Sequence, residues 1–316
     1  MKSFKTYDEQ LDILVEKGLK IEDRTYAIRI LKKEDYYNLI NGYKKLFVTV
    51  DDIRKKERFK EKVTFEEIYS LYALDRELRT LILPYLLKFE TNMKSSISYH
   101  FSSRYRKNHS YLEVKNYSRD IKASSYVLAL IANKFQVIKS KGTQVGSIKH
   151  HLDNYDHVPL WVLMRFLTLG HVHKMYTCLQ PTVKNLISKD FANEFNIDYD
   201  LNVTFTPEML GATLKIINFF RNVSAHEERL HNFRVVKTPK LRGISNALAL
   251  TQEEFGGGNL FSLLATLKLV LSKSDFEILK ITFTHLIGHY APKFKSVLFH
   301  EIMNEMGFSG SWDELI

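Results

Sequence analysis

Residues 64–101 read TFEEIYSLYALDRELRTLILPYLLKFETNMKSSISYHF, and this stretch decides the fold class. Thr64 and Glu67 have the spacing of a capping box, in which each side chain accepts a hydrogen bond from the other residue's backbone at a helix start. Apolar residues then recur every three or four positions, the period of an amphipathic helix. They are Leu71, Leu74, Leu78, Leu81, Ile82, Leu86, Phe89, Met93, Ile97 and Phe101. Because proline lacks a backbone N–H, we expect Pro84 to kink or split this helix.

Helix starts are marked in the same way along the rest of the chain. Thr6 and Glu9 have the spacing of another capping box, while Asp23 and Pro207 stand at further predicted helix starts. The alternation typical of a strand is rare, although residues 47–50 can form one extended edge. The sequence therefore predicts an all-α protein, built as a multi-helix bundle.

Three segments are expected along the chain. Residues 1–62 look like an N-terminal helical module, and 63–232 hold the long helices. Residues 233–316 begin with a basic connector, which contains Arg234, Lys237, Lys240 and Arg242, and continue as a helical tail. These segments are the predicted domains.

Several features bear on the cellular location. No apolar run approaches the roughly 18 residues that would suggest a membrane span, and the first ten residues lack the apolar core of a signal peptide. The single cysteine, Cys178, leaves no internal disulfide to form and is expected to be buried. We therefore expect a cytoplasmic protein without membrane association.

Positive charge is concentrated in residues 101–150, although the whole chain carries a net charge of +10. Ten basic residues in this segment face two acidic ones, Glu113 and Asp120, which leaves +8. The basic residues are Arg104, Arg106, Lys107, Lys115, Arg119, Lys122, Lys134, Lys139, Lys141 and Lys149. Such an excess is typical of a surface that binds a polyanion, with a solvated helix face as the alternative.

Aromatic residues are interspersed among these charges. They are Tyr105, Tyr111, Tyr117 and Tyr126. Exposed tyrosines would stack on unpaired bases, whereas buried ones would belong to the core. The sequence leaves both interpretations open.

Residues 221–226, RNVSAH, contain the candidate catalytic groups. The guanidinium of Arg221 can hold a phosphate through two parallel hydrogen bonds. The imidazole of His226 can move a proton near neutral pH without a metal. These groups, with Asn222 beside them, suit cleavage of an RNA phosphodiester. The alternative is a polar helix face that closes an interdomain or dimer contact.

We expect residues 207–231 to form one helix of about seven turns. Five residues separate Arg221 from His226, so the two side chains project about 140° apart on a straight helix. They can share one phosphate only if the helix end is distorted or a second copy faces the first across a two-fold axis. A homodimer with a composite site is therefore expected.

The pattern Arg221-Asn222-x-x-Ala225-His226-x-x-Arg229-Leu230-x-Asn232 resembles the signature of abortive-infection phage-resistance proteins of the AbiD/AbiF type, which belong to the HEPN superfamily. Upstream blocks resemble the family in the same order. These blocks are Phe4-x-Thr6-Tyr7-x-x-Gln10, Tyr36-Tyr37-x-Leu39-x-x-Gly42-Tyr43, and Val158-Pro159-Leu160-Trp161 with Leu169-Gly170. The resemblance spans residues 3–235 and implies a HEPN-like helical core over 63–232.

This resemblance implies a metal-independent endoribonuclease that needs no cofactor and leaves 2′,3′-cyclic phosphate ends. His226 would act as general base or acid, Arg221 would stabilise the charge on the phosphorane, and Asn222 would orient His226 or bind a phosphate oxygen. The RNA-binding residues expected around this centre are Arg229, Asn232, Arg104, Arg106, Lys107 and Lys122. The family's role implies a growth-arresting toxin of phage defence, with a small noncoding RNA or a protein as a possible regulator.

Four residues depart from the family's pattern. Glu227 stands where Asn is usual, Ser224 where Cys is common, Arg165 where an acidic residue is frequent, and Lys94 where Arg is frequent. Glu227 places a negative charge beside the expected phosphate site, and Lys94 is spaced for a surface ion pair with Glu90.

Two other functions remain open. The first is an RNA-binding protein without catalysis that holds a structured noncoding RNA, and the second is a protein-interaction scaffold. No metal site is expected, because the histidine pairs lack cysteines or carboxylates at ligand spacing.

Overall fold

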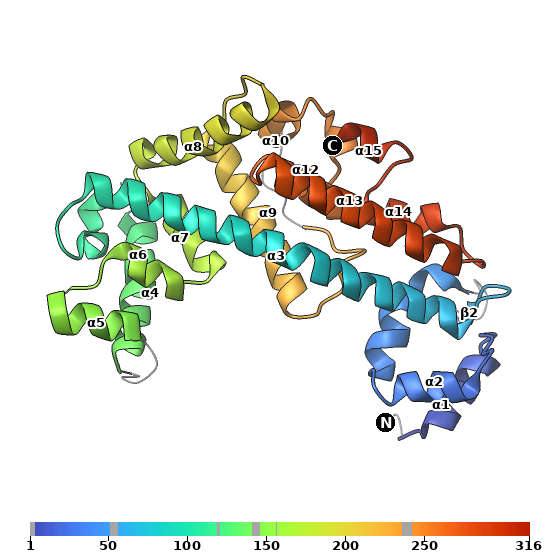
Figure 1. Cartoon of the computed structure of the whole chain (residues 1–316). Helices are drawn as coiled ribbons and strands as arrows, with labels where there is room; N and C mark the ends of the chain where they lie inside the picture. Colours follow the sequence, from blue (N-terminus) through green and yellow to red (C-terminus); the bar gives the residue numbers. More distant parts are fainter. Residues whose placement is uncertain (1–3, 51–55, 119–120, 141–145, 156, 236–241) are drawn as a thin grey trace. The chain divides into compact units, whose positions relative to one another are not determined.

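The computed structural model describes residues 4–50, 56–118, 121–140, 146–155, 157–235 and 242–316 (Figure 1). The regular secondary structure of the described residues is helical apart from two three-residue strands, β1 (Val48–Val50) and β2 (Glu57–Phe59), which pair antiparallel. This confirms the all-α prediction and the extended edge near residue 48.

The chain divides into two compact units, each assembled from segments far apart in the sequence. Unit 1 comprises residues 1–82, 223–233 and 277–314, and unit 2 comprises 83–222, 234–276 and 315–316. The boundary falls inside four helices: α3 (Phe65–Arg104), α9 (Pro207–Ala225), α13 (Lys273–Tyr290) and α15 (Trp312–Leu315). The three predicted domains remain a prediction.

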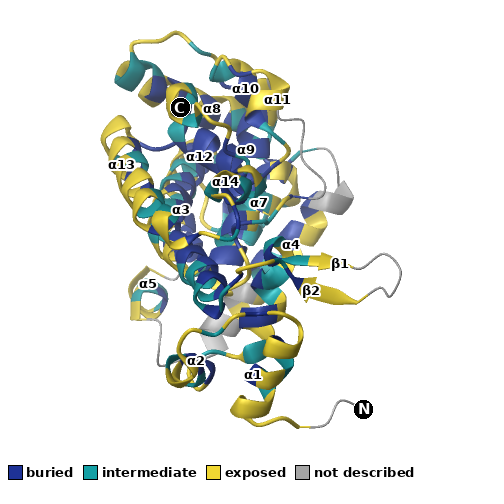
Figure 2. Cartoon of the chain, turned by 90° about the vertical axis from the view of Figure 1, so that its right-hand side faces the viewer, coloured by how far each residue is buried: buried dark blue, intermediate teal, exposed yellow. Residues whose placement is uncertain are grey.

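Unit 1 contains the N-terminal helices, the strand pair and the last helices of the chain. Besides its parts of α3 and α13, its helices are α1 (Tyr7–Glu16), α2 (Arg24–Leu31), the π-helical η1 (Tyr37–Asn41), η2 (Lys44–Phe47), η6 (Ala291–Lys293), α14 (Phe299–Met306) and most of α15 (Trp312–Leu315). The outer faces of α1 and α2 are exposed (Figure 2).

Unit 2 contains the second half of α3 and the helices that follow it. These are η3 (Ser110–Leu112), η4 (Val114–Asn116), α4 (Ile121–Ser140), α5 (Gly146–Tyr155), α6 (Leu160–Leu163), η5 (Met164–Phe166), α7 (Leu169–Cys178), α8 (Pro181–Tyr199), most of α9, α10 (Arg242–Ala247), α11 (Gln252–Phe255) and α12 (Leu260–Lys268). Residues 260–267 of α12 are all buried.

The long helix α3 begins at the predicted capping box. The Thr64 N–H donates to Oε2 of Glu67 at 3.1 Å, and the Glu67 N–H donates to Oγ1 of Thr64 at 3.2 Å. Pro84 lies inside the unbroken helix, so it does not split α3, and the alternative of a kink stays a prediction. The buried stripe continues on both sides of Pro84 through Ile82 and Leu86, and this packing keeps the helix unbroken where one backbone donor is missing.

In unit 1, Glu67 joins α3 to the segment that follows α13. Its Oε1 accepts hydrogen bonds from the backbone N–H groups of Lys295 and Ser296, at 2.5 and 2.6 Å. The Tyr290 hydroxyl donates to Glu77 at 2.6 Å. Polar contacts with α3 therefore fix this C-terminal segment inside unit 1.

Two of the four tyrosines from the basic segment belong to the core of unit 2. Tyr111 and Tyr117 are buried, and their hydroxyls donate to the carbonyls of Val158 and Tyr111 at 2.8 and 2.7 Å. Tyr126 is exposed instead, with the Lys174 ammonium 4.8 Å from its ring centroid. Cys178 is buried, as predicted. Within the described residues, no helix is both long and apolar enough to cross a membrane.

Candidate functional site

Helix α9 ends at Ala225, so the prediction of one helix through residue 231 is wrong. Glu227 adopts a left-handed backbone conformation with φ 55°, and the Glu228 N–H donates to the Val223 carbonyl at 3.1 Å. This six-to-one bond is that of a Schellman motif, which places His226 at the helix cap and Glu227 at the first residue beyond it. A left-handed residue cannot continue an α-helix, which is why the helix stops here.

Glu227 occupies a position that demands a particular backbone conformation. Glycine and asparagine adopt left-handed φ most readily, because other side chains crowd the backbone there. The Asn that is usual in the family therefore suits the helix end itself. The departure at Glu227 concerns the backbone as well as the charge beside His226.

Arg221 lies on α9 and is fixed by a carboxylate on α3, within unit 2. Its Nε donates to Oε2 of Glu90 at 3.3 Å, while Oε1 of Glu90 accepts from the Lys94 ammonium at 2.7 Å. The side chains of Arg221, Glu90 and Lys94 are 26%, 9% and 16% exposed. The predicted Lys94–Glu90 ion pair is present, but it is largely buried instead of lying on the surface.

The other two candidate catalytic residues are exposed. Asn222 follows Arg221 on α9, and His226 caps the helix. Between them, Ser224 is buried, and its hydroxyl has no hydrogen-bond partner among the described residues. The boundary between the two units falls between Asn222 and Val223.

Asp75 on α3 organises the segment that follows His226, within unit 1. Its fully buried carboxylate accepts hydrogen bonds from the backbone N–H groups of Leu230, at 3.0 Å, and His231, at 2.5 Å. The Tyr43 hydroxyl donates to it at 2.8 Å, and Arg79 forms a short ion pair with it. These five residues form what we call the Asp75 cluster.

Electrostatics in the Asp75 cluster favour the ionised carboxylate. Burial raises the pKa of Asp75, but hydrogen bonds from His231 and the charges of His231 and Arg79 outweigh it, so the pKa lies below its usual value. Burial and the nearby Asp75 carboxylate raise the pKa of Tyr43. Tyr43 therefore remains a neutral donor.

Arg229, predicted to bind RNA, touches the backbone of unit 1. Its Nη1 donates to the Gly42 carbonyl at 2.7 Å. Next to this contact, the rings of Tyr43 and His231 stack with their centroids 5.2 Å apart. Two blocks of the family pattern, residues 36–43 and 229–232, thus meet in space.

The basic residues predicted to bind RNA lie mainly at the C-terminal end of α3. Arg104, Arg106 and Lys107 are exposed there, and the Arg104 guanidinium lies 5.8 Å from the Tyr105 ring centroid. Asn232 is half-buried. The side chain of Lys122, like those of Arg119, Lys134, Lys139 and Lys141, falls outside the described residues.

Sequence reasoning missed Glu90 as the partner of Arg221, and it missed the entire Asp75 cluster. The sequence did contain one indication for each. Asp75 and Glu90 are acidic residues that interrupt the apolar stripe of α3, and a charged residue on a buried face needs a partner. No group of three His, Cys, Asp or Glu side chains that could hold a metal occurs in the part of the chain that the structure describes.

The fold and the motif define an all-α protein with an Arg and a His five residues apart at the end of a helix. A model of the Abi-like protein family matches residues 29–232, more than half of the chain, and the chain belongs to this family. This membership points to abortive-infection defence against phage. No curated protein and no solved structure matches the chain.

Proposed function

We propose that this Abi-like protein is a metal-independent endoribonuclease of the HEPN type, whose cleavage of RNA halts growth during phage infection. The observation that carries the proposal is the geometry of the motif. Arg221 is fixed through its Nε by Glu90, at 3.3 Å, while Asn222 and His226 are exposed at the end of the same helix. One nitrogen of the guanidinium is used for positioning, and its other donors remain suited to a phosphate.

In the proposed reaction, His226 removes the proton of a ribose 2′-OH, and the 2′-oxygen forms a bond to phosphorus. The bond from phosphorus to the 5′-oxygen breaks as that oxygen takes up a proton. The products carry a 2′,3′-cyclic phosphate and a 5′-hydroxyl. Arg221 stabilises the extra negative charge on the phosphorane, and Asn222 orients His226 or binds a phosphate oxygen.

The helix geometry supports a site shared by two copies of the chain. Arg221 and Ala225 lie within regular helix, and His226 is the cap, so the five-residue offset still turns the two side chains about 140° apart. In a homodimer, Arg221 of one protomer and His226 of its partner can face one phosphate. One imidazole then acts as base and the other as acid.

RNA contacts outside the motif are assigned to the basic and polar residues that the sequence indicates. Arg104, Arg106 and Lys107 follow one another at the end of α3, and Lys122 follows in α4. Arg229 uses one nitrogen on the Gly42 carbonyl and keeps further donors for the RNA backbone, with Asn232 nearby in sequence. Such contacts would make the affinity for RNA depend on salt.

The test is sequencing of RNA ends after incubation with wild-type protein, Arg221→Ala and His226→Ala. We expect new 2′,3′-cyclic ends with wild type and none with either variant. His300→Ala, which removes an exposed histidine elsewhere, is the matched control and should cleave normally. Cleavage by His226→Ala at the wild-type rate would show that the assignment is wrong.

A second candidate is an RNA-binding protein without catalysis, and the exposed carboxylate of Glu227 beside His226 favours it. The same experiment separates the two functions. The second candidate requires a structured RNA that co-purifies with both wild type and His226→Ala and that carries no new ends.

A further inference from the structure

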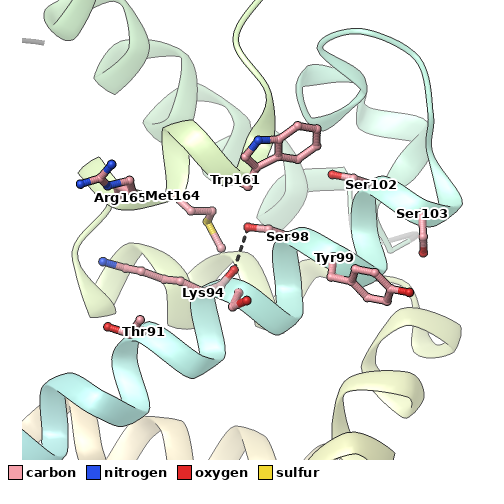
Figure 3. Close-up of a pocket in the computed structure, with 10 residues that line it drawn as sticks. Thr91, Lys94, Ser98, Tyr99, Ser102, Ser103, Trp161, Met164 and Arg165 are labelled. Carbon is pink, nitrogen blue, oxygen red and sulfur yellow. Dashed lines mark hydrogen bonds between the residues drawn. The ribbon is translucent and has the colours of Figure 1, made fainter. Parts of the chain in front are cut away.

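A pocket of about 750 Å³ lies between the C-terminal half of α3 and the α6–η5 segment, entirely within unit 2 (Figure 3). This volume falls in the usual range for small-molecule and cofactor sites. One threonine and four serines line its α3 side. None of the proposed catalytic residues lines it.

Two aromatic rings flank the pocket and are unusually exposed. Trp161 is 57% exposed and Tyr99 is 69% exposed. They come from different elements, α6 and α3, and Figure 3 shows them on the side of the pocket away from Arg165. Exposed aromatic rings at a cavity mouth are suited to stacking on a planar ligand.

Two cations line the opposite side of the pocket. Figure 3 shows Lys94 and Arg165 there, and none of the described residues that line the pocket is acidic. Glu90 on α3, which does not line the pocket, accepts a hydrogen bond from the Lys94 ammonium at 2.7 Å and also binds Arg221. One carboxylate shared between two cations leaves net positive charge next to the pocket.

We infer that this pocket binds one unpaired nucleotide. The base stacks on Trp161 and Tyr99, and the phosphate binds Lys94, Arg165 and the hydroxyl of Ser95, because the hydroxyls of Thr91, Ser98 and Ser103 already donate to backbone carbonyls of α3. Rings on one side and cations on the other match the two chemically different ends of a nucleotide. The inference takes RNA as the ligand from the proposed function but does not depend on cleavage.

The position of the pocket along α3 suits a strand of RNA. Ser102 and Ser103 line the pocket, and Arg104, Arg106 and Lys107 follow them directly in the chain. A nucleotide in the pocket would therefore have its neighbours close to the exposed basic end of α3. A free nucleotide would present the same base and phosphate to the pocket as a nucleotide within an RNA strand. A titration with both kinds of ligand distinguishes them.

The experiment uses the fluorescence of Trp161 in the full-length protein. The chain has two tryptophans, so Trp312→Phe leaves Trp161 as the single tryptophan, which is excited selectively over the tyrosines at the red edge of the absorption band. Trp312 packs on Phe283 and Phe308, and phenylalanine preserves aromatic packing there. His226→Ala is added so that RNA stays intact during titration. The probes are a single-stranded oligouridylate of about ten nucleotides and uridine 5′-monophosphate.

We expect the oligonucleotide to quench Trp161. In anisotropy measurements with labelled oligonucleotide, Trp161→Ala should raise Kd about tenfold and leave its salt dependence unchanged. Arg165→Gln should raise Kd and lower the slope of log Kd against log salt by about one. Lys189→Gln removes an exposed cation on α8 outside the pocket and is the matched control. It should change both Kd and the salt slope less than Arg165→Gln does.

Quenching by uridine monophosphate at the affinity of the oligonucleotide would support a free nucleotide, and quenching by the oligonucleotide alone would support RNA. The inference is overturned if neither probe quenches Trp161, or if folded Trp161→Ala and Arg165→Gln bind like Lys189→Gln. Because these variants are scored for binding in the His226→Ala background, failure here is distinct from failure of cleavage by the wild-type protein.

Discussion

Asp75 accepts hydrogen bonds from both the backbone N–H and the imidazole of His231, at 2.5 and 3.2 Å, across 156 residues of sequence. This contact attaches the segment after His226 to the first half of α3, within unit 1. Arg79 reinforces it by donating to the Glu228 carbonyl at 3.2 Å. The chain beyond the proposed catalytic histidine is thus held by buried polar contacts.

Asp75→Asn should destabilise the protein strongly near neutral pH. The substitution leaves Arg79 and His231 buried without their carboxylate, and removing one partner of a buried pair costs about 3–5 kcal/mol in the free energy of unfolding. Urea titration of wild type and variant measures this difference. Asp153→Asn, at an exposed position, is the control and should change little. Equal losses for the two variants would contradict the prediction.

The same carboxylate predicts how stability depends on pH. Burial raises the pKa of Asp75, but the interactions with His231 and Arg79 lower it by a larger amount. The pKa in the folded state therefore lies below the value in the unfolded state. The ionised group therefore contributes stability above about pH 4, and this contribution is lost as the pH falls below that value. Wild type should lose more stability than Asp75→Asn between about pH 5 and pH 2. Parallel curves for the two proteins would refute the assignment.

Glu90→Gln should impair cleavage through the position of Arg221. The amide has no charge to hold Arg221 and Lys94, and a displacement of about 1 Å at such a group can cost about 100-fold in rate. We expect single-turnover cleavage to fall by about tenfold to 100-fold. RNA affinity should change much less. Glu194→Gln on α8 is an exposed control, and normal cleavage by Glu90→Gln would exclude the positioning role.

Glu227→Gly should stabilise the protein, because the left-handed φ of 55° no longer meets a side chain. The expected gain is about 1 kcal/mol in the free energy of unfolding. Ala225→Gly, two residues earlier and still in the helix, should have the opposite sign and cost about 0.5–1 kcal/mol. Denaturant titrations of both variants test the helix end directly. Destabilisation by Glu227→Gly would contradict a left-handed backbone at this residue.

Two further variants separate charge from backbone at this position. Glu227→Asn and Glu227→Gln both remove the negative charge, but only asparagine favours the left-handed conformation. Greater stability for Asn than for Gln, with equal cleavage rates, would assign the departure at Glu227 to the backbone. Faster cleavage by both would show that the charge restrains catalysis.

Ser224→Ala should raise the free energy of unfolding by about 1 kcal/mol, because a buried hydroxyl without a partner carries an uncompensated desolvation cost. Ser224→Cys should behave similarly, since a thiol is a weak hydrogen-bonding group. Thermal or urea unfolding provides the measurement. Ser125→Ala, at an exposed position, is the comparison, and a loss of stability in Ser224→Ala alone would show that the hydroxyl is bonded.

Features set by neighbouring residues could be predicted from the sequence. The capping box at Thr64 and the helix start at Pro207 depend on contacts within a few positions, and the extended edge near Val48 pairs with a strand only about ten residues away. The end of α9 could not be predicted from the sequence, because glutamate is not a residue that favours a left-handed backbone. The choice between a kink and a break at Pro84 could not be made either, since packing on both sides of this residue decides whether the helix continues.

The supports of the candidate site depend on contacts between distant residues, and local patterns do not specify them. Glu90 and Arg221 lie 131 residues apart, and Gly42 and Arg229 lie 187 apart. The sequence identified Arg221 and His226 as chemically suited groups. It did not show which carboxylate orients Arg221, or that Arg229 bonds the backbone of the Gly42 block.

Glu90 makes the charges of Arg221 and Lys94 dependent on each other. Its two oxygens are divided between these cations, at 3.3 and 2.7 Å, so any anion that draws Lys94 away leaves the whole carboxylate to Arg221. An anion bound at Lys94 would thus change the affinity of Arg221 for a second anion. By thermodynamic reciprocity, an anion bound at Arg221 would change the affinity at Lys94 by the same factor. Anion binding at the proposed α9 site and in the proposed nucleotide pocket would therefore be thermodynamically linked through a single side chain.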